Sequence, residues 1–135
     1  MGNAINKLLE LPSDRPPDTM KARIPRLDLE VTLREIPYNK IVSLRGRTDA
    51  DLLYLKESIA EPDIRDKAWW KDHMGCPSPV EALRKLLKKG EVEKLCRAAD
   101  KLNGYGAGSV LEAPPGALEG AAIGAALEDL EKTDS

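Results

Sequence analysis

Phenylalanine is absent from this chain of 135 residues, and its aromatic side chains are limited to two tryptophans and three tyrosines. A core with so few large aromatic side chains has to be built mainly from leucine, isoleucine, valine and alanine. The length is that of one domain, and a compact fold of this size buries roughly two-thirds of the surface that its unfolded chain exposes. This composition favours a small, mainly α-helical domain.

Histidine and cysteine are almost as scarce, with one His and two Cys in the whole chain. His73, Cys76 and Cys96 could form an incomplete zinc site or a cysteine and histidine pair. However, a structural zinc site normally has four ligands, and a nucleophilic cysteine needs a positioned base. No glycine-rich nucleotide-binding loop follows a predicted strand. The sequence therefore predicts no enzymatic activity, no cofactor and no metal site.

Long apolar runs are missing as well. No stretch reaches the roughly 18 to 20 apolar residues that a membrane-spanning helix needs. The first residues do not have the pattern of a secretory signal peptide, and two cysteines in such a chain are typical of free thiols in a reducing compartment. We expect a cytoplasmic protein without a membrane partner.

A strong excess of one charge is also lacking, because 21 basic and 23 acidic side chains give a formal net charge of −2. This balance argues against a general nucleic-acid binder and against a membrane-surface protein. The charge is unevenly distributed, however, since residues 112–135 carry −5 and residues 1–111 carry +3. The acidic side chains of the last segment are Glu112, Glu119, Glu128, Asp129, Glu131 and Asp134, against Lys132 alone.

The chain divides into three segments. Residues 1–18 are expected to form an amphipathic arm with a flexible, proline-containing joint, because Ile5, Leu8 and Leu9 have helical spacing and so short a helix is marginal in water. Residues 19–111 form the folded body. Residues 112–135 are rich in alanine, glycine and acidic side chains, and are expected to form a mobile tail.

A small β-hairpin is predicted at the start of the body, because apolar and polar residues alternate in two neighbouring segments. The apolar residues are Met20, Ala22 and Ile24 in the first segment, and Leu27, Leu29, Val31 and Leu33 in the second. Pro25 confines the first strand to an edge of the sheet. A two-stranded hairpin is not stable alone, so helices must pack against its apolar face.

About five short helices are predicted after the hairpin. Thr48 with Asp51 resembles a capping box at the start of the second helix. Ile59 aligns with the apolar face of that helix, and Pro62 bars it from continuing. A brief third helix is expected between positions 66 and 75.

The last two helices have the most complete sequence pattern. Ser78 and Pro79 suit the N-cap and first position of a helix, and Glu81 suits the third position of a capping box. Gly90 is expected to end this helix in a left-handed conformation. The next helix is predicted by an apolar stripe at helical spacing, which consists of Val92, Leu95, Cys96, Ala99 and Leu102.

This pair of helices leaves DNA binding open as one function. Two helices joined by a tight turn are typical of helix-turn-helix proteins, and basic residues such as Arg84 and Lys85 could contact phosphates. The second helix, however, begins with Glu91 and Glu93, at the end that would face the DNA. These acidic residues make DNA binding the weaker alternative.

Two adjacent tryptophans favour protein binding instead. Trp69 and Trp70 lie in the predicted short helix, where neighbouring side chains point about 100° apart. One of the two is therefore expected to be exposed. Exposed aromatic side chains are common anchors for protein partners.

Several short motifs follow one another in a distinctive order along residues 4–111. They are Glu61-Pro62-Asp63, a helix start from Gly75 to Pro79, Lys89-Gly90, and a closing segment from Leu102 to Tyr105. In this order the chain resembles the phage tail assembly chaperones of contractile-tailed phages and related defective prophages. Each motif alone is common in helical proteins, so the combined order carries the resemblance. The segment beyond Ala113 matches no pattern of that family.

The resemblance implies a non-enzymatic assembly factor in the cytoplasm of the bacterial host. Such chaperones bind the long, apolar tape-measure protein and keep it soluble until tail-tube subunits polymerise around it, and they are absent from the mature virion. The expected partner is the tape-measure protein, with the tail-tube protein as a second candidate and no nucleic acid. The alternative is a small helix-turn-helix-like DNA-binding or phage regulatory protein. The residues expected to contact the partner are Trp69, Trp70, Met74, Leu86 and Leu95.

Overall fold

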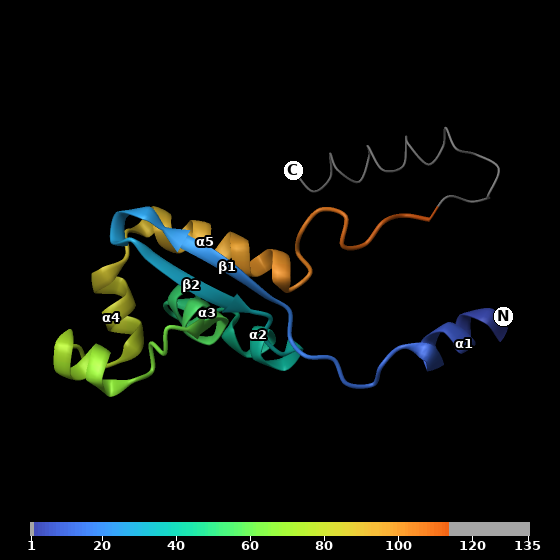
Figure 1. The fold of residues 1–135 in the computed structure, drawn as a ribbon, viewed down its shortest axis with the longest axis horizontal. Coiled ribbons are helices and arrows are strands. Elements are labelled where there is room, and N and C mark those ends of the chain that lie inside the picture. The colour runs from blue at the N-terminus through green and yellow to red at the C-terminus, as the bar shows by residue number, and fades with distance from the viewer. Residues whose placement is uncertain (1, 114–135) are drawn as a thin grey trace.

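The computed structural model describes residues 2–113 of the chain (Figure 1). A short helix, α1 (Gly2–Glu10), projects away from the body. The body begins with strands β1 (Thr19–Ile24) and β2 (Leu29–Arg34), which are joined by the 3-10 turn η1 (Pro25–Leu27). Most of the predicted tail, from residue 114 onward, lies outside the described residues.

Five helical segments follow β2 in the described part of the chain. They are α2 (Tyr38–Leu44), α3 (Ala50–Ser58), the π-helical turn η2 (Ala68–His73), α4 (Pro79–Leu86) and α5 (Lys89–Leu102). The predicted fold class is confirmed, since a small sheet near the amino terminus is packed on short helices. Among the residues described, none of the helices has the length and apolar character needed to cross a membrane.

The sheet has the strand order β1-β2-β3, and both neighbouring pairs are antiparallel. At the hairpin tip Ile24 pairs with Leu29, so these apolar side chains share one face of the sheet. Helix α5 packs against both strands of the hairpin, and α3 packs against α5. The other face is polar, and there Lys21 and Glu30 form an ion pair at 3.4 Å. The predicted hairpin, with β1 at the edge, is confirmed, except that Leu27, which was expected in the second strand, lies in the turn η1.

The core lies between the apolar face of the hairpin and helices α3, α4 and α5. Leu33, Leu55 and Leu83 come from β2, α3 and α4, and their exposed fractions are 0%, 0% and 2%. The buried members of the predicted stripe on α5 are Val92, Leu95 and Ala99. The core is therefore aliphatic, as the absence of phenylalanine requires.

The segment after α3 differs from the prediction. The helix ends at Ser58, and Ile59 begins a third strand, β3 (Ile59–Glu61), instead of continuing the helical face. Ile59 pairs with Leu33 of β2. A strand of three residues is too short to show a period of two, so the pairing with a distant strand decides its conformation.

Two predicted helix boundaries are also wrong. Thr48 does not cap α3, because Asp49 occupies the N-cap position in a left-handed conformation with φ of 60°. Gly90 does not end α4, because it lies in the first turn of α5. The chain instead leaves α4 at Leu87, which has extended dihedral angles. The predicted Ser78 cap of α4 is confirmed, since the Ser78 hydroxyl accepts a hydrogen bond from the Glu81 N–H at 3.2 Å. The predicted capping box is not completed, because the Glu81 carboxylate accepts a hydrogen bond from Arg84 at 3.3 Å instead.

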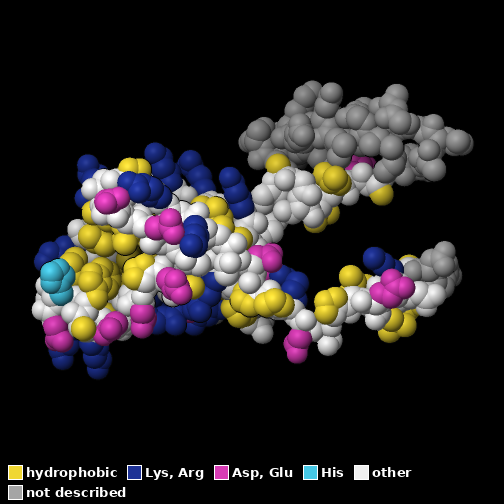
Figure 2. Space-filling model, viewed as in Figure 1, with side chains coloured by type: hydrophobic (Ala, Val, Ile, Leu, Met, Phe, Trp, Pro, Cys, Tyr) yellow, Lys and Arg dark blue, Asp and Glu magenta, His cyan; other side chains and the backbone are white. Residues whose placement is uncertain are grey.

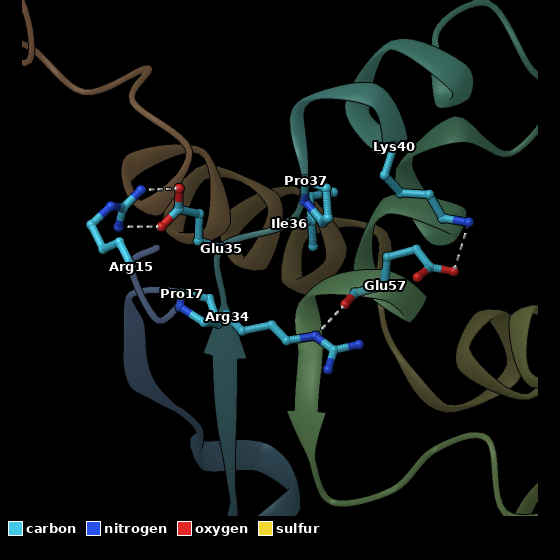
Figure 3. A pocket seen from close by; sticks show the side chains of 8 residues that line it. All are labelled: Arg15, Pro17, Arg34, Glu35, Ile36, Pro37, Lys40 and Glu57. Carbon is cyan, nitrogen blue, oxygen red and sulfur yellow. Dashed lines mark hydrogen bonds and ion pairs between the residues drawn. The ribbon is translucent and has the colours of Figure 1, made fainter. Parts of the chain in front are cut away.

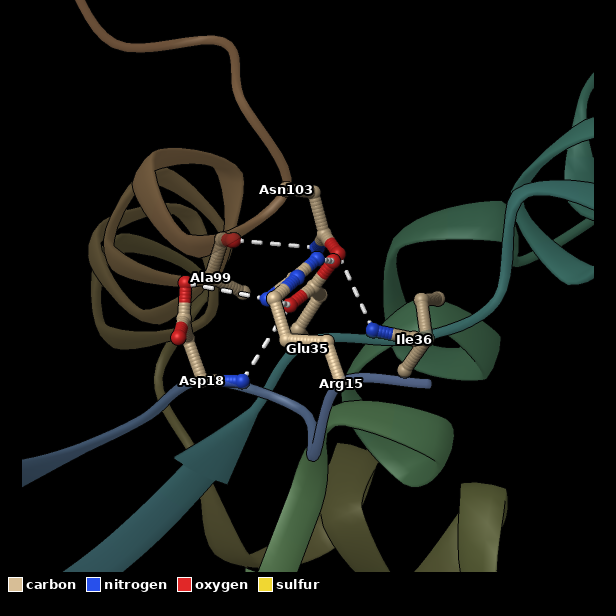
Figure 4. Close-up of polar contacts among 6 residues, drawn as sticks. All are labelled: Arg15, Asp18, Glu35, Ile36, Ala99 and Asn103. Atoms are coloured by element: carbon tan, nitrogen blue, oxygen red, sulfur yellow. Dashed lines mark hydrogen bonds and ion pairs between the residues drawn. The ribbon is translucent and has the colours of Figure 1, made fainter. Parts of the chain in front are cut away.

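The joint between α1 and the body is held at the end of the sheet away from the hairpin tip (Figure 4). Arg15 donates two hydrogen bonds to the Glu35 carboxylate, at 2.9 and 2.7 Å, and the Asp18 N–H donates a third at 3.1 Å. Beside them Asn103, at the end of α5, accepts a hydrogen bond from the Ile36 N–H at 3.0 Å. The two ends of the described chain therefore leave the body at the same end of the sheet (Figure 1).

Helix α1 keeps its apolar side chains exposed. Ile5, Leu8 and Leu9 have exposed fractions of 55%, 63% and 77%, and every side chain from Ala4 to Thr19 is classed as exposed. The arm thus has the predicted amphipathic helix, and this helix adds nothing to the core.

Replacing Leu55 by alanine is expected to lower the free energy of unfolding by about 3 kcal/mol, because a fully buried side chain is replaced by a cavity. Urea unfolding followed by circular dichroism measures the loss. The matched control is Val42→Ala on α2, where the side chain is 48% exposed and the change should stay below about 0.5 kcal/mol. Equal losses in both variants would contradict this placement of the core.

Candidate functional site

An apolar cavity of about 300 Å³ lies between the hairpin, the segment from β3 to η2, and helices α4 and α5. Eleven of its twelve lining residues are apolar, and the exception is Asp63. Figure 2 shows hydrophobic side chains gathered on this side of the molecule, next to the single histidine, His73. The cavity is therefore the candidate site for an apolar ligand or partner.

The sheet supplies the floor of the cavity. Ile24 and Leu29 are paired at the hairpin tip, and Val31 lies two residues further along β2 on the same face. Ile24 and Val31 are buried, with exposed fractions of 5% and 3%, whereas Leu29 is half-buried. The alternating pattern of the hairpin thus places one continuous apolar surface below the opening.

Helix α4 supplies one wall. Leu83 and Leu86 are three residues apart and lie on the same side of the helix, and Leu87, directly after its last residue, lines the cavity with them. Leu83 and Leu87 are buried, while Leu86 is half-buried. The apolar side of α4 therefore both packs against the core and forms the rim of an opening.

Arg26 fixes the junction between α4 and α5 against the hairpin tip. Its guanidinium donates hydrogen bonds to both carboxylate oxygens of Glu91, at 2.9 and 2.7 Å, and to the carbonyl oxygen of Leu86 at 2.7 Å. Glu91 also accepts a hydrogen bond from the Lys88 N–H at 2.8 Å, which caps α5. These bonds, those from Arg26 first, lower the pKa of Glu91 to about 2.

The single charged residue in the lining lies at the exposed rim. Asp63 accepts a hydrogen bond from the Arg65 N–H at 3.2 Å, so its carboxylate serves the local turn. Among the residues that the structure describes, no group of three or more His, Cys, Asp or Glu side chains is placed to hold a metal ion. The chemistry of the cavity is that of burying apolar side chains.

Three of the five predicted contact residues line this one cavity. Trp69 from η2 and Leu86 from α4 are half-buried at its rim, and Leu95 from α5 is buried, with 6% of its surface exposed. Leu95 is therefore a core residue that an occupant reaches only inside the cavity. The structure brings together side chains that are 26 positions apart in the sequence.

Trp70 and Met74 do not line the cavity. The indole N–H of Trp70 donates a hydrogen bond to the carbonyl oxygen of Arg65 at 2.9 Å, and the Met74 carbonyl accepts one from the Lys85 ammonium at 3.2 Å. The prediction that one tryptophan is exposed is wrong, because both are half-buried. The hydrogen bond to Arg65 holds the Trp70 ring against the preceding loop.

Nine of the twelve lining residues were not predicted as part of a site. Ile24 and Leu29 were assigned to the inward face of the hairpin, but nothing in the local pattern shows that α4 lies over them. Ile59 and Ile64 flank Pro62, but Ile59 was expected on the apolar face of the preceding helix, and Ile64 belongs to no periodic segment. Their signal was their apolar character on both sides of a proline turn, which alone does not identify a binding site.

A second cavity of about 530 Å³ lies at the other end of the sheet (Figure 3). Its charged side chains engage partners nearby: Arg15 binds Glu35, Lys40 lies 3.7 Å from the Glu57 carboxylate, and Arg34 donates to the Glu57 carbonyl oxygen at 3.0 Å. These groups hold the arm joint and α3 to the sheet. The smaller, apolar cavity is therefore the better candidate for a binding site.

No protein-family model, curated protein or solved structure matches this chain. The assignment of the candidate site accordingly depends on the geometry of the cavity alone.

The free energy of unfolding is expected to fall in acid because two ion-paired carboxylates, Glu35 and Glu91, become protonated. The hydrogen bonds from Arg15 to Glu35 and from Arg26 to Glu91 lower the pKa of each glutamate to about 2, from an ordinary value of 4.5. A lowered pKa in the folded state means that the stabilisation is complete above pH 4.5 and is lost as the pH falls towards 2. Urea unfolding at steps across this range measures the loss.

The variant with Glu35→Gln and Glu91→Gln is expected to be less stable at pH 7 and to depend less on pH in that window. Its curve should meet that of the unmodified protein near pH 2. Glu93→Gln is the matched control, because Glu93 is exposed on α5 and has no ion-pair partner among the described residues. If the free energy of unfolding depended on pH in the same way in the double variant and the unmodified protein, the role given to Glu35 and Glu91 would be contradicted.

Proposed function

We propose that this chain is a phage tail assembly chaperone. In this proposal it binds the tape-measure protein, keeps it soluble and hands it to polymerising tail-tube subunits. The observation that carries the proposal is the apolar cavity, since it gathers Trp69, Leu86 and Leu95 around one opening. The order of motifs along residues 4–111 supports the same family.

The cavity suits an amphipathic helix of the partner. In helix-in-groove binding, apolar side chains three and four positions apart enter a hydrophobic groove and supply most of the binding energy. The cavity floor and the α4 wall offer aliphatic surface for such side chains, while Trp69 at the rim provides an aromatic anchor. A tape-measure protein is a long, largely helical chain with apolar faces, so it presents segments of this kind repeatedly.

Each contact in this proposal is weak, and many copies act together. The tail tube must displace the chaperone as it grows, and a row of modest sites can be released one at a time. A single cavity of about 300 Å³, closed on most sides by buried residues, fits such a modest contact. Many copies then keep the apolar faces of the long partner covered before assembly.

Co-expression with the tape-measure protein of the same phage tests the proposal. The unmodified chain should hold that protein in the soluble fraction, and Leu86→Glu should weaken the complex by about tenfold or more, because it places a charge at the cavity rim. Val42→Glu is the matched control, since it adds the same charge to an exposed site on α2. Trp69→Ala provides a second variant if Leu86→Glu fails to fold.

Three results would contradict the proposal. The first is precipitation of the tape-measure protein equally with and without this chain. The second is an equal loss of binding in the Leu86 and Val42 variants. The third is a tight, strongly salt-dependent complex with mixed-sequence duplex DNA, which would favour the alternative DNA-binding function.

A further inference from the structure

A second groove, of about 430 Å³, lies between the edge strand β1 and helix α5. Its floor is apolar and includes Ala22, Ile24 and Ala98. Its rim is basic, with Arg23, Arg26, Lys88 and Lys94, and Glu91 is the single acidic residue in the lining. Because Glu91 is held by Arg26, the groove presents an apolar surface with an excess of positive charge.

The positive charge continues along the exposed side of α5. Arg97 and Lys101 follow Lys94 at intervals of three and four residues, so they extend the same row along the helix. In the described part of the chain none of these three residues, nor Lys88, has an ion-pair partner. Figure 2 shows lysine and arginine side chains along the edge of the molecule where β1 and α5 lie.

The chain itself contains a segment that complements this groove. Residues 114–135 lie outside the described residues, and their sequence carries five acidic side chains against Lys132 alone. Ile123, Leu127 and Leu130 are spaced four and three positions apart, so in a helix they would share one side. Glu128 and Glu131 directly follow two of these apolar positions. An acidic segment with an apolar side matches a basic groove with an apolar floor.

The length of the connecting segment allows the contact. Lys94 lies eight residues before the end of α5 at Leu102, which corresponds to about 12 Å along the helix. Residues 103–109 form turns at the end of α5, and the seven residues 110–116 can span up to about 23 Å when extended. The segment can therefore fold back along α5 without any change in the body, and the tether gives it an effective concentration near the millimolar range.

We propose that residues 117–131 dock in the groove between β1 and α5 of the same chain. Their apolar side lies on the floor at Ala22, Ile24 and Ala98, and their carboxylates face Lys94 and Arg97. The groove adjoins the apolar cavity, with which it shares Ile24 and Leu95, but the contact with residues 117–131 does not require a bound tape-measure protein.

Zero-length carbodiimide cross-linking of the full chain tests the contact, because it joins a lysine amine to a carboxylate only when the two form an ion pair. Mass spectrometry of the monomer is expected to find Lys94 or Lys88 joined to Glu128, Asp129 or Glu131. The yield should drop severalfold in about 1 M salt, where the Debye length is about 3 Å. Lys67 and Lys71, which are exposed near η2, serve as internal controls and should not join these carboxylates.

Amide hydrogen exchange provides an independent measurement in the full chain. Residues 117–131 are expected to be protected, and Lys94→Glu with Arg97→Glu should speed their exchange about tenfold by reversing the charge of the rim. Lys67→Glu with Lys71→Glu makes the same change of net charge elsewhere and should leave the protection intact.

Two outcomes would overturn the proposal. In a mixture of isotopically labelled and unlabelled protein, cross-links found only between chains would assign the groove to a second copy. Absence of these cross-links, together with exchange at the rate of an unstructured peptide, would show that the acidic segment does not dock.

Discussion

The arrangement of the helices around the cavity depends on the hydrogen bonds that Arg26 donates. The residue lies at the hairpin tip, and its guanidinium joins the carboxylate at the start of α5 to the last carbonyl of α4. Helix ends leave such carbonyl groups without intrahelical partners, so one side chain satisfies a helix end and forms a two-point ion pair. The junction of α4 and α5 is thereby fixed over the sheet, and the cavity is the space enclosed between them.

The few aromatic residues lie outside the fully buried core. None of the two tryptophans and three tyrosines is fully buried: Tyr38 is 81% exposed, and both tryptophans are half-buried. Tyr54 donates a hydrogen bond to Asp100 at 2.8 Å and accepts one from Asn103 at 2.7 Å, so it links α3 to the end of α5. Tyr54 thus bridges two elements and Trp69 lies at the cavity rim, while the buried core is aliphatic.

The features that could be predicted from the sequence are those with a local physical cause. The alternation of apolar and polar residues around Val31 predicted the hairpin. Ser78 predicted the start of α4, and the apolar stripe through Leu95 predicted α5. The features that could not be predicted depend on distant residues. Ile59 forms a strand because it meets Leu33, and α5 begins before Gly90 because the Glu91 side chain binds the Lys88 N–H.

The same distinction applies to the candidate site. Trp69, Leu86 and Leu95 could be named from their residue types and helical context, and they do meet at one cavity. Other lining residues, such as Ile24 and Ile64, take positions that depend on how the sheet and the loop after β3 pack together. A single sequence contains no local signal for that packing, so the cavity as a whole becomes visible only in three dimensions.

The place where the two ends of the chain leave the body has a consequence for any array of copies. Arg15 and Asn103 hold both ends at one end of the sheet, and the apolar cavity opens at the other (Figures 1 and 4). Copies bound through their cavities along one filament would all point their amino-terminal arms outward. The apolar cavities would then face the filament, and the exposed apolar side chains of α1 would lie on the outside of the array, free to contact a further partner.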